Sequence, residues 1–224
     1  MTAGNDRTVL IELWSDLGCP WCYLGKHRLE AAIAQRPDAE RFDVRLRSYE
    51  LDPRAAAEPE PILDHLARKY GGPLEQVQTM EGRVQALATA DGLPYVTERA
   101  TANTLAVHRL QHYAAEQGLG TRLFGAVQDG YFAGTLNPFD TEQLVGAAAS
   151  VGLDADAVRT VLAGDAYTDD VRADEEEGQA LGATGVPFIV YGRRYATAGA
   201  QSVEGYAQVL AQTVADSAAG ASAG

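Results

Sequence analysis

Two cysteines separated by two residues are the part of this sequence best suited to chemistry. Cys19 and Cys22 are the only cysteines in the chain, and Pro20 and Trp21 stand between them. Such a pair can switch between a dithiol and a disulfide, because one thiolate attacks a partner's sulfur and the second thiol resolves the mixed disulfide. The spacing therefore predicts redox chemistry on thiols.

Two other uses of a close cysteine pair have to be weighed. A zinc site needs about four ligands, but the sequence holds no third cysteine, and its histidines at 27, 65, 108 and 112 show no pairing with this stretch. An inert structural disulfide would close only a small loop and would restrict the unfolded chain little. We therefore expect no metal and a redox-active pair.

The residues around the pair predict a strand that leads into a helix. Residues 8–14 are apolar and rich in β-branched side chains, which indicates a buried strand. From Pro20 onward the apolar residues recur at helical spacing, so a helix should begin near Pro20. Cys19 would then lie at the helix N-terminus, where unpaired N–H groups and the helix dipole favour a thiolate. Cys22, one turn further in, would be the resolving thiol.

The rest of the chain predicts two β-rich ends around a helical middle. Residues 42–49 alternate apolar and polar side chains, as a half-buried strand does, and complete a β-α-β unit. A hairpin of strands 186–191 and 194–197 and a helix over 202–216 close the chain. Between these ends, helices are expected over residues 61–70, 73–90, 101–118, 121–133, 140–151, 154–163 and 168–181.

This order of elements predicts the fold class and the domains. An α/β fold is expected, in which residues 1–55 and 165–224 share a sheet and residues 56–164 form an inserted helical domain. The order β-α-β, insertion, α-β-β-α is that of a thioredoxin fold. The helix over 168–181 is rich in Asp and Glu and is expected to be mostly solvated.

Composition limits the partners and the location. The chain has 31 acidic and 18 basic residues and a net charge of −13, which argues against nucleic acid or an anionic membrane as partner. Its first residues hold no apolar signal segment, and no stretch approaches the roughly 18 apolar residues of a spanning helix. We therefore expect a cytoplasmic protein, where a close cysteine pair is more often catalytic or redox-sensing than structural.

The stretch Ser15–Lys26 closely resembles the DsbA-like thioredoxin family, and particularly its cytosolic FrnE-like branch. Further segments fit the same branch in the same order, namely Tyr49–Pro53, Asn103–Leu110, Gly185–Phe188 and Arg194–Gln201. The resemblance implies a thioredoxin-like fold with an inserted α-helical domain, thiol-disulfide oxidoreductase activity and a cis peptide bond before Pro187.

Two related groups differ from this chain at one informative position. The 2-hydroxychromene-2-carboxylate isomerases and the kappa-class glutathione transferases share the architecture but carry serine where this chain has Cys19. The resemblance therefore favours disulfide exchange over glutathione-dependent isomerisation, although a glutathione-binding groove could persist. No cofactor is expected beyond glutathione as a cosubstrate. Some FrnE-like proteins have a second cysteine pair near the C-terminus, which this chain lacks.

The resemblance also suggests which residues meet a substrate. Pro187 would present the Val186 backbone to an incoming peptide or thiol, next to Pro20 and Trp21 of the motif. A strand-start proline is the plainer interpretation of Pro187. Asp16 could tune the thiol or position a water, and equally it could be a loop or capping residue.

Three residues further along the chain are candidates for the same groove. Asn103 and His108 lie on a helix of the insertion that the resemblance places over the active-site mouth, although Asn103 could simply cap and His108 could be structural. Gln201 precedes the last helix, whose N-terminal amides could hold a carboxylate such as that of glutathione. An ordinary loop and cap is an equal alternative for Gln201. His27 falls on another helical face and is expected to be structural.

These features together predict a cytoplasmic DsbA-family thiol-disulfide oxidoreductase that exchanges the Cys19–Cys22 disulfide with client protein or small-molecule thiols. A glutathione-dependent isomerase or transferase acting on a small aromatic or polyketide-like molecule is one alternative, and a non-enzymatic redox sensor is another. The sequence also allows the protein to form a homodimer. The insertion is expected to cover the active site with an apolar-walled groove, because Trp21, Tyr23 and Leu24 follow the motif.

Overall fold

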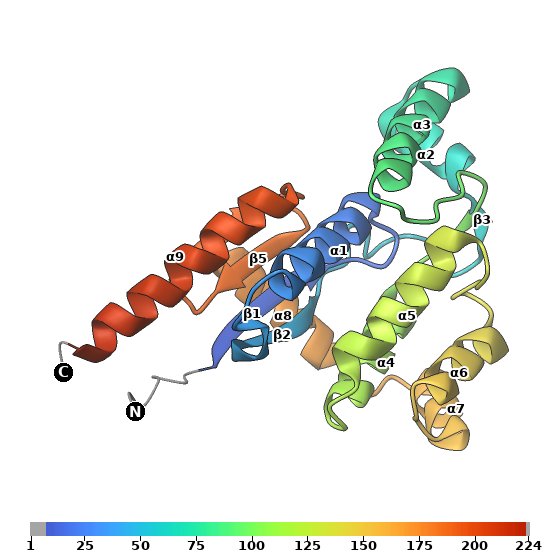
Figure 1. Ribbon diagram of the computed structural model, residues 1–224. Helices are drawn as coiled ribbons and strands as arrows, with labels where there is room; N and C mark the ends of the chain where they lie inside the picture. Colours follow the sequence, from blue (N-terminus) through green and yellow to red (C-terminus); the bar gives the residue numbers. More distant parts are fainter. Residues whose placement is uncertain (1–7, 223–224) are drawn as a thin grey trace.

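A four-stranded sheet forms the centre of the structure, a computed structural model that describes residues 8–222 (Figure 1). The outermost residues of both predicted β-rich ends therefore lie outside the described residues. The strand order is β2-β1-β5-β6. Strand β1 pairs in parallel with β2 and antiparallel with β5, and β5 pairs antiparallel with β6. These strands cover Val9–Ser15 (β1), Phe42–Ser48 (β2), Phe188–Tyr191 (β5) and Tyr195–Ala198 (β6).

Helices cover both faces of this sheet. On one face, α1 (Pro20–Ala34) and α9 (Val203–Ser222) pack on the side chains of Ile11 and Leu13. On the other face, α8 (Thr168–Ala180) lies against β1 and β2, and Trp14 donates from Nε1 to the Asp174 carbonyl at 2.7 Å. Because both faces are covered, β1 is buried along nearly its whole length, and five of its seven side chains are apolar.

The middle of the chain consists of three helical hairpins. Their helices are α2 (Ile62–Tyr70), α3 (Leu74–Ala90), α4 (Leu105–Ala115), α5 (Gly120–Ala133), α6 (Thr141–Ser150) and α7 (Ala155–Ala163). In Figure 1, α2 with α3 and α6 with α7 lie at opposite ends of α5. Asp140 and Asp154 begin α6 and α7 by accepting hydrogen bonds from backbone N–H groups three residues on. Gly71 ends α2 in the left-handed conformation at φ 65°.

Most predicted elements are confirmed, with one clear difference. The helix expected over 101–118 covers only Leu105–Ala115. Residues Ala100–Thr101 instead form a short strand, β4, that pairs antiparallel with Glu60–Pro61, strand β3. A short 3₁₀ turn at Ala39–Arg41 was also not expected. The β3–β4 pair depends on contacts between distant residues, which helical periodicity does not report. The 3₁₀ turn is held by local hydrogen bonds, such as that from the Arg41 N–H to the Asp38 carbonyl.

One buried cluster joins the sheet to the helical middle. Side chains from β1, β2, α1 and α9 contact side chains from α4 to α7 without a break, for example Leu46 with Leu110 and Leu123 in the same cluster. The predicted domain boundaries at 55 and 165 therefore stay a prediction, since this core is shared. A second cluster lies where α1, α3 and α5 meet, and it includes Tyr23 and Phe132.

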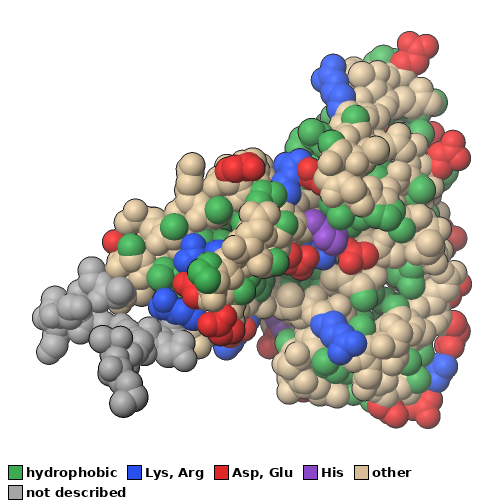
Figure 2. Space-filling model, viewed as in Figure 1, with side chains coloured by type: hydrophobic (Ala, Val, Ile, Leu, Met, Phe, Trp, Pro, Cys, Tyr) green, Lys and Arg blue, Asp and Glu red, His purple; other side chains and the backbone are tan. Residues whose placement is uncertain are grey.

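The surface is predominantly acidic. Figure 2 shows red side chains spread along the edge that α2, α3, α5, α6 and α7 form, with hydrophobic side chains between them. Of the helices between residues 8 and 222, none has both the length and the apolar character that crossing a membrane requires.

Candidate active site

Cys19 begins helix α1 as its N-cap residue. Its backbone is extended, at φ −83° and ψ 111°, and its Sγ accepts a hydrogen bond from the Cys22 N–H at 3.3 Å. The Cys19 carbonyl accepts from the N–H groups of Cys22 and Tyr23 at 3.1 and 3.2 Å. The sulfur thus lies at the N-terminus of α1, where the first N–H groups and the positive end of the helix dipole meet.

The two cysteines have different surroundings. Both are free thiols, Cys22 is completely buried, and Cys19 is 4% exposed. Burial raises the pKa of the Cys22 thiol well above its ordinary value, and the neighbouring Cys19 raises it further by hydrogen bonding and by charge. The nearby Asp16 backbone and Ser15 side chain oppose this shift in the Cys22 pKa only in part. Cys22 therefore stays protonated, and Cys19 is the sulfur that a partner can reach.

A proline loop closes the site on its second side. The Val186–Pro187 peptide bond is cis, and the Cys19 thiol donates to the Val186 carbonyl at 3.6 Å. Gly25 allows this loop to approach α1, since a Cβ there would lie 3.1 Å from Pro187 Cγ and 3.1 Å from the Tyr206 hydroxyl oxygen. The cis bond that the family resemblance implied is present, and the Val186 carbonyl lies beside the reactive sulfur.

A small cavity of about 110 Å³ opens beside Cys19. The active-site loop forms one wall, and helix α2 of the predicted insertion forms another. This arrangement confirms that part of the insertion lies over Cys19. The lining is mixed rather than wholly apolar: Ile62, Leu66, Leu51, Ala55, Ala102 and Tyr70 alternate with Asp16, Asp52, His65, Lys69, Thr101 and Thr104.

Asp16 is the charged group most deeply set in this cavity. Its Oδ1 accepts from the Thr104 hydroxyl at 2.8 Å and lies 3.3 Å from His108 Nε2, and its Oδ2 accepts from the Leu51 N–H at 2.8 Å. Burial by itself would raise the pKa of Asp16. The hydrogen bond and charge of His108, with the Leu51 and Thr104 donors, outweigh burial and hold the pKa of Asp16 below its ordinary value.

Two residues expected to line the groove lie elsewhere. His108 is completely buried, and it reaches the site only through Asp16. Asn103 points away from the cysteines, since its side chain accepts from the Leu105 N–H and donates to the Pro53 carbonyl. Both expectations are corrected for the same reason: Thr104, the residue just before α4, faces the cavity, so Asn103 hydrogen-bonds to the first residue of α4 and His108 lies one turn deeper.

The remaining predicted contacts are scattered. Pro20 lines the cavity. Trp21 does not line it, and its side chain is 45% exposed. Tyr23 and Leu24 are buried in the cluster between α1, α3 and α5, so they do not form a groove wall. Gln201 donates from its side chain to the Ala198 and Gly199 carbonyls. A substrate-binding role for Trp21 and Gln201 stays a prediction.

Several residues at the site were not predicted. Thr104, Lys69 and His65 come from helices far from the motif in sequence, and no spacing connects them to it. Gly25 carried a usable signal, because a glycine inside a helical pattern often marks a close approach of another segment.

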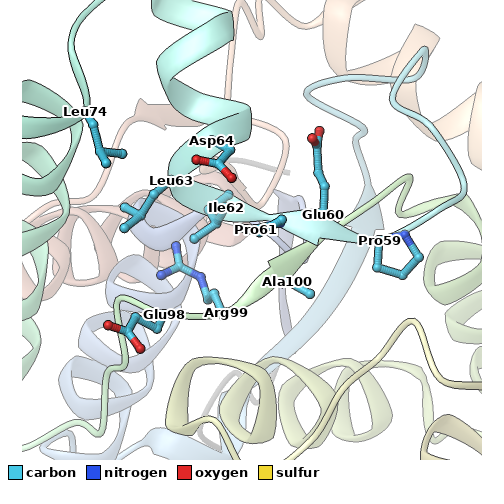
Figure 3. Close-up of a pocket in the computed structure, with 10 residues that line it drawn as sticks. All are labelled: Pro59, Glu60, Pro61, Ile62, Leu63, Asp64, Leu74, Glu98, Arg99 and Ala100. Atoms are coloured by element: carbon cyan, nitrogen blue, oxygen red, sulfur yellow. The ribbon is translucent and has the colours of Figure 1, made fainter.

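A larger cavity of about 600 Å³ lies at the start of α2 and α3 (Figure 3). It shares Ile62 with the cavity beside Cys19, but its lining contains no cysteine, serine, threonine, lysine or histidine. Its arginine, Arg99, is already paired with Glu81 at 2.7 Å and lies over the rings of Tyr95 and Phe132. Reactive chemistry is therefore assigned to the smaller cavity. Within the described part of the chain, no three His, Cys, Asp or Glu side chains are grouped to hold a metal ion.

Comparison with known proteins gives consistent results. Residues 10–211 match the family model described as the DSBA-like thioredoxin domain. A crystal structure of a probable DsbA oxidoreductase from Streptomyces coelicolor is 45% identical in sequence, with a TM-score of 0.87 over 92% of this chain and 90% of that chain. No functionally curated protein matches significantly.

Two further solved structures share the fold at low sequence identity. A 2-hydroxychromene-2-carboxylate isomerase is 18% identical, with a TM-score of 0.65 over 93% of this chain and 98% of that chain. The cytosolic disulfide reductase DsbM from Pseudomonas aeruginosa, solved with GSH, is 19% identical, with a TM-score of 0.60 over 92% of this chain and 98% of that chain. At these identities the likeness concerns the fold.

Proposed function

Because this chain belongs to the DSBA-like thioredoxin domain family, we propose that it is a thiol-disulfide oxidoreductase that exchanges its Cys19–Cys22 disulfide with client thiols. One observation carries the proposal. Cys19 places its sulfur at a helix N-terminus and at the edge of a cavity, while Cys22 is buried directly behind it. An attacking thiolate and a protected resolving thiol need this division of roles.

In the reducing direction, the Cys19 thiolate attacks one sulfur of a client disulfide. A bond forms between Cys19 and the client, the client S–S bond breaks, and the other client sulfur leaves as a thiolate that takes a proton from water. Cys22 then loses its proton and attacks the Cys19 sulfur, which releases the second client thiol and forms the Cys19–Cys22 disulfide. The client gains two electrons and the protein loses two. The same steps in reverse oxidise a client dithiol.

The surroundings of Cys19 support clients with an extended backbone and apolar side chains. The Val186 carbonyl, next to Pro187, lies beside the sulfur and is free to accept a client N–H once the Cys19 thiol has ionised. Leu51 and Tyr70 line the cavity and are large apolar side chains that remain 44% and 58% exposed. An exposed apolar surface of this kind favours peptide contact.

We further propose that the reaction takes place in the cytoplasm and that a small thiol such as glutathione recycles the pair. Lys69 supports this proposal, because its ammonium group lines the cavity and is only loosely paired with Asp52 at 3.9 Å. A glutathione carboxylate could replace Asp52 there. The Pseudomonas reductase solved with GSH makes glutathione the first thiol to test.

The test compares single-serine variants in exchange with a fluorescent disulfide-linked peptide. Cys19→Ser should abolish exchange, and Cys22→Ser should accumulate a covalent protein–peptide adduct that dithiothreitol releases. Exchange that survives in Cys19→Ser would overturn the proposal. Full turnover by Cys22→Ser with glutathione would show that glutathione itself resolves the mixed disulfide, so that Cys22 is not needed as the resolving thiol.

A further inference from the structure

We infer that Asp16 and His108 form a charged pair that sets the reduction potential of the Cys19–Cys22 couple, with His108 as a positioning residue that acts through Asp16. The inference rests on the proposed function, because it concerns the potential of the same cysteine pair. Neither residue belongs to the Cys-x-x-Cys motif, and the exchange steps above use neither of them.

Asp16 contacts the reactive cysteine through its backbone, because its carbonyl accepts from the Cys19 N–H at 3.3 Å. The Asp16 backbone also acts to lower the pKa of the Cys22 thiol. The Asp16 carboxylate lines the same cavity as Cys19 and is only 5% exposed. A negative charge is therefore held in the wall of the cavity from which the Cys19 sulfur is reached, in a region with little water to screen it.

Donors from two distant segments fix this carboxylate. Leu51 follows strand β2, and Thr104 and His108 belong to the start of α4, so three parts of the chain meet at Asp16. The His108 ring is completely buried and packs near Phe124, with ring centroids 5.6 Å apart. The imidazole therefore has one orientation, with Nε2 toward Asp16.

His108 also faces a second buried carboxylate. Burial raises the pKa of Glu50, and this shift is opposed by the hydrogen bond from Arg172 and by the charge of His108. His108 Nδ1 and Glu50 Oε1 are both buried and have no hydrogen-bond partner among the described residues. His108 thus lies near two acidic groups, Asp16 and Glu50, of which Glu50 is also paired with Arg172 at 2.7 Å.

The expected direction of the effect follows from the charge on the sulfur. The Cys19 thiolate exists only in the reduced protein, so repulsion from the Asp16 carboxylate destabilises the reduced form alone. The His108 hydrogen bond and charge weaken that repulsion. Removing the carboxylate should therefore make the couple more oxidising, and removing His108 should make it more reducing.

The experiment measures the equilibrium between protein disulfide plus two glutathione and protein dithiol plus glutathione disulfide. Asp16→Asn should raise the equilibrium constant for reduction of the protein about tenfold, which is about 30 mV for a two-electron couple. His108→Gln keeps an N–H donor but carries no charge, and it should lower the constant several-fold. Alkylation of Cys19 by iodoacetamide in the reduced protein should become faster in Asp16→Asn and slower in His108→Gln.

His112→Gln is the matched control, because His112 lies one turn further along α4 and contacts Asp174 instead of Asp16. It should leave the constant unchanged. Opposite shifts in the two test variants support the inference, since a merely structural role would not give opposite signs. Shifts in the same direction, or no shift, overturn it.

A further variant keeps the test interpretable if His108→Gln or Asp16→Asn does not fold. Thr104→Val removes one donor to Asp16 without changing any charge, and it should shift the constant in the His108→Gln direction by a smaller factor. An unchanged or raised constant in Thr104→Val would count against the inference. If the wild-type protein exchanges no disulfide with glutathione or with the peptide, the proposed function fails and this inference fails with it. Normal wild-type exchange with unshifted variants removes the inference alone.

Discussion

Helix α4 carries two histidines one turn apart, and each contacts a buried carboxylate in a different region. His108 lies 3.3 Å from Asp16 beside Cys19, whereas His112 lies 3.1 Å from Asp174 of α8. The residue types and their spacing are the same, but the neighbours differ. Asp16 shares a cavity with a reactive sulfur, and Asp174 is enclosed by the sheet. The role of a carboxylate–histidine pair is therefore decided by the group it faces.

The Asp174 cluster fixes α8 on the sheet. Asp174 accepts from the Ser48 N–H at 2.8 Å and from Arg47 at 3.1 Å, and its carbonyl accepts from Trp14. Ser48, His112 and Asp174 resemble a hydrolytic triad only in residue types. The Ser48 hydroxyl and the Asp174 carboxylate both contact the same nitrogen of His112, Nε2. Ser48 is also completely buried. A triad base needs its two nitrogens on different partners, so this cluster is structural.

The largest expected contrast between the two regions is in exchange activity. Cys19→Ser should abolish exchange with the disulfide peptide, while the free energy of unfolding of the reduced protein changes by less than about 1 kcal/mol. The folded fraction of the Asp174→Ala protein should still exchange disulfides with the peptide at a measurable rate. A folded Asp174→Ala protein without exchange would contradict the division between the regions.

The next contrast is in stability. Asp174→Ala should lower the free energy of unfolding by about 1 to 3 kcal/mol, because the buried Ser48 N–H loses its partner, while Arg47 keeps its pair with Glu12 at 2.6 Å. Urea unfolding of the reduced protein measures this loss. Asp43→Ala serves as the control, since its pair with Arg45 at 2.8 Å is exposed and should contribute less than about 1 kcal/mol.

A smaller effect is expected where α1 meets the proline loop. Gly25→Ala gains about 1 kcal/mol of helix propensity, but its Cβ would press on Pro187 and Tyr206 at 3.1 Å. The two effects should nearly cancel in stability, while the displaced proline loop slows exchange. Gly82→Ala on α3 is the control, because a Cβ there meets nothing within 4 Å. Equal exchange rates in both variants would show that the contact at Gly25 is unimportant.

The smallest effect concerns pH. The folded pKa of Asp16 is lowered, so its contribution to stability is fully present above the unfolded value of about 3.9 and is lost as pH falls through the folded pKa. The stability advantage of wild type over Asp16→Asn should therefore shrink only in strongly acidic solution. Urea unfolding of both proteins between pH 7 and the acid limit measures the difference. An advantage that grows on acidification would contradict the observed environment of Asp16.

Local patterns predicted the parts of the site that lie close together in sequence. Cys19, Cys22 and the start of α1 follow from one strand, one proline and a change of periodicity. Pro187 entered through resemblance and lies where the family motif implied. Each of these features is decided within a few residues or by a known motif.

The charged surroundings of Cys19 could not be predicted in the same way. The partners of Asp16 are residues 51, 104 and 108, which meet only after the chain has folded. The acidic helix over 168–181 gives a second example. Its composition indicates a solvated helix, and three of its six carboxylates are exposed, yet Asp174 is buried because Arg47 and His112 converge on it. Composition describes a whole helix and does not single out one side chain.

The shared buried cluster has a consequence for how this protein can be divided. Leu46 of β2 and Leu123 of α5 belong to one continuous apolar interior, so the helical middle is not a detachable module. A chain cut down to the two β-rich ends would leave that side of the sheet uncovered and should be poorly soluble. Heat should melt the sheet and helices α4 to α7 in a single cooperative transition. A chimera that takes this helical segment from a relative would therefore also need the sheet residues that the segment contacts.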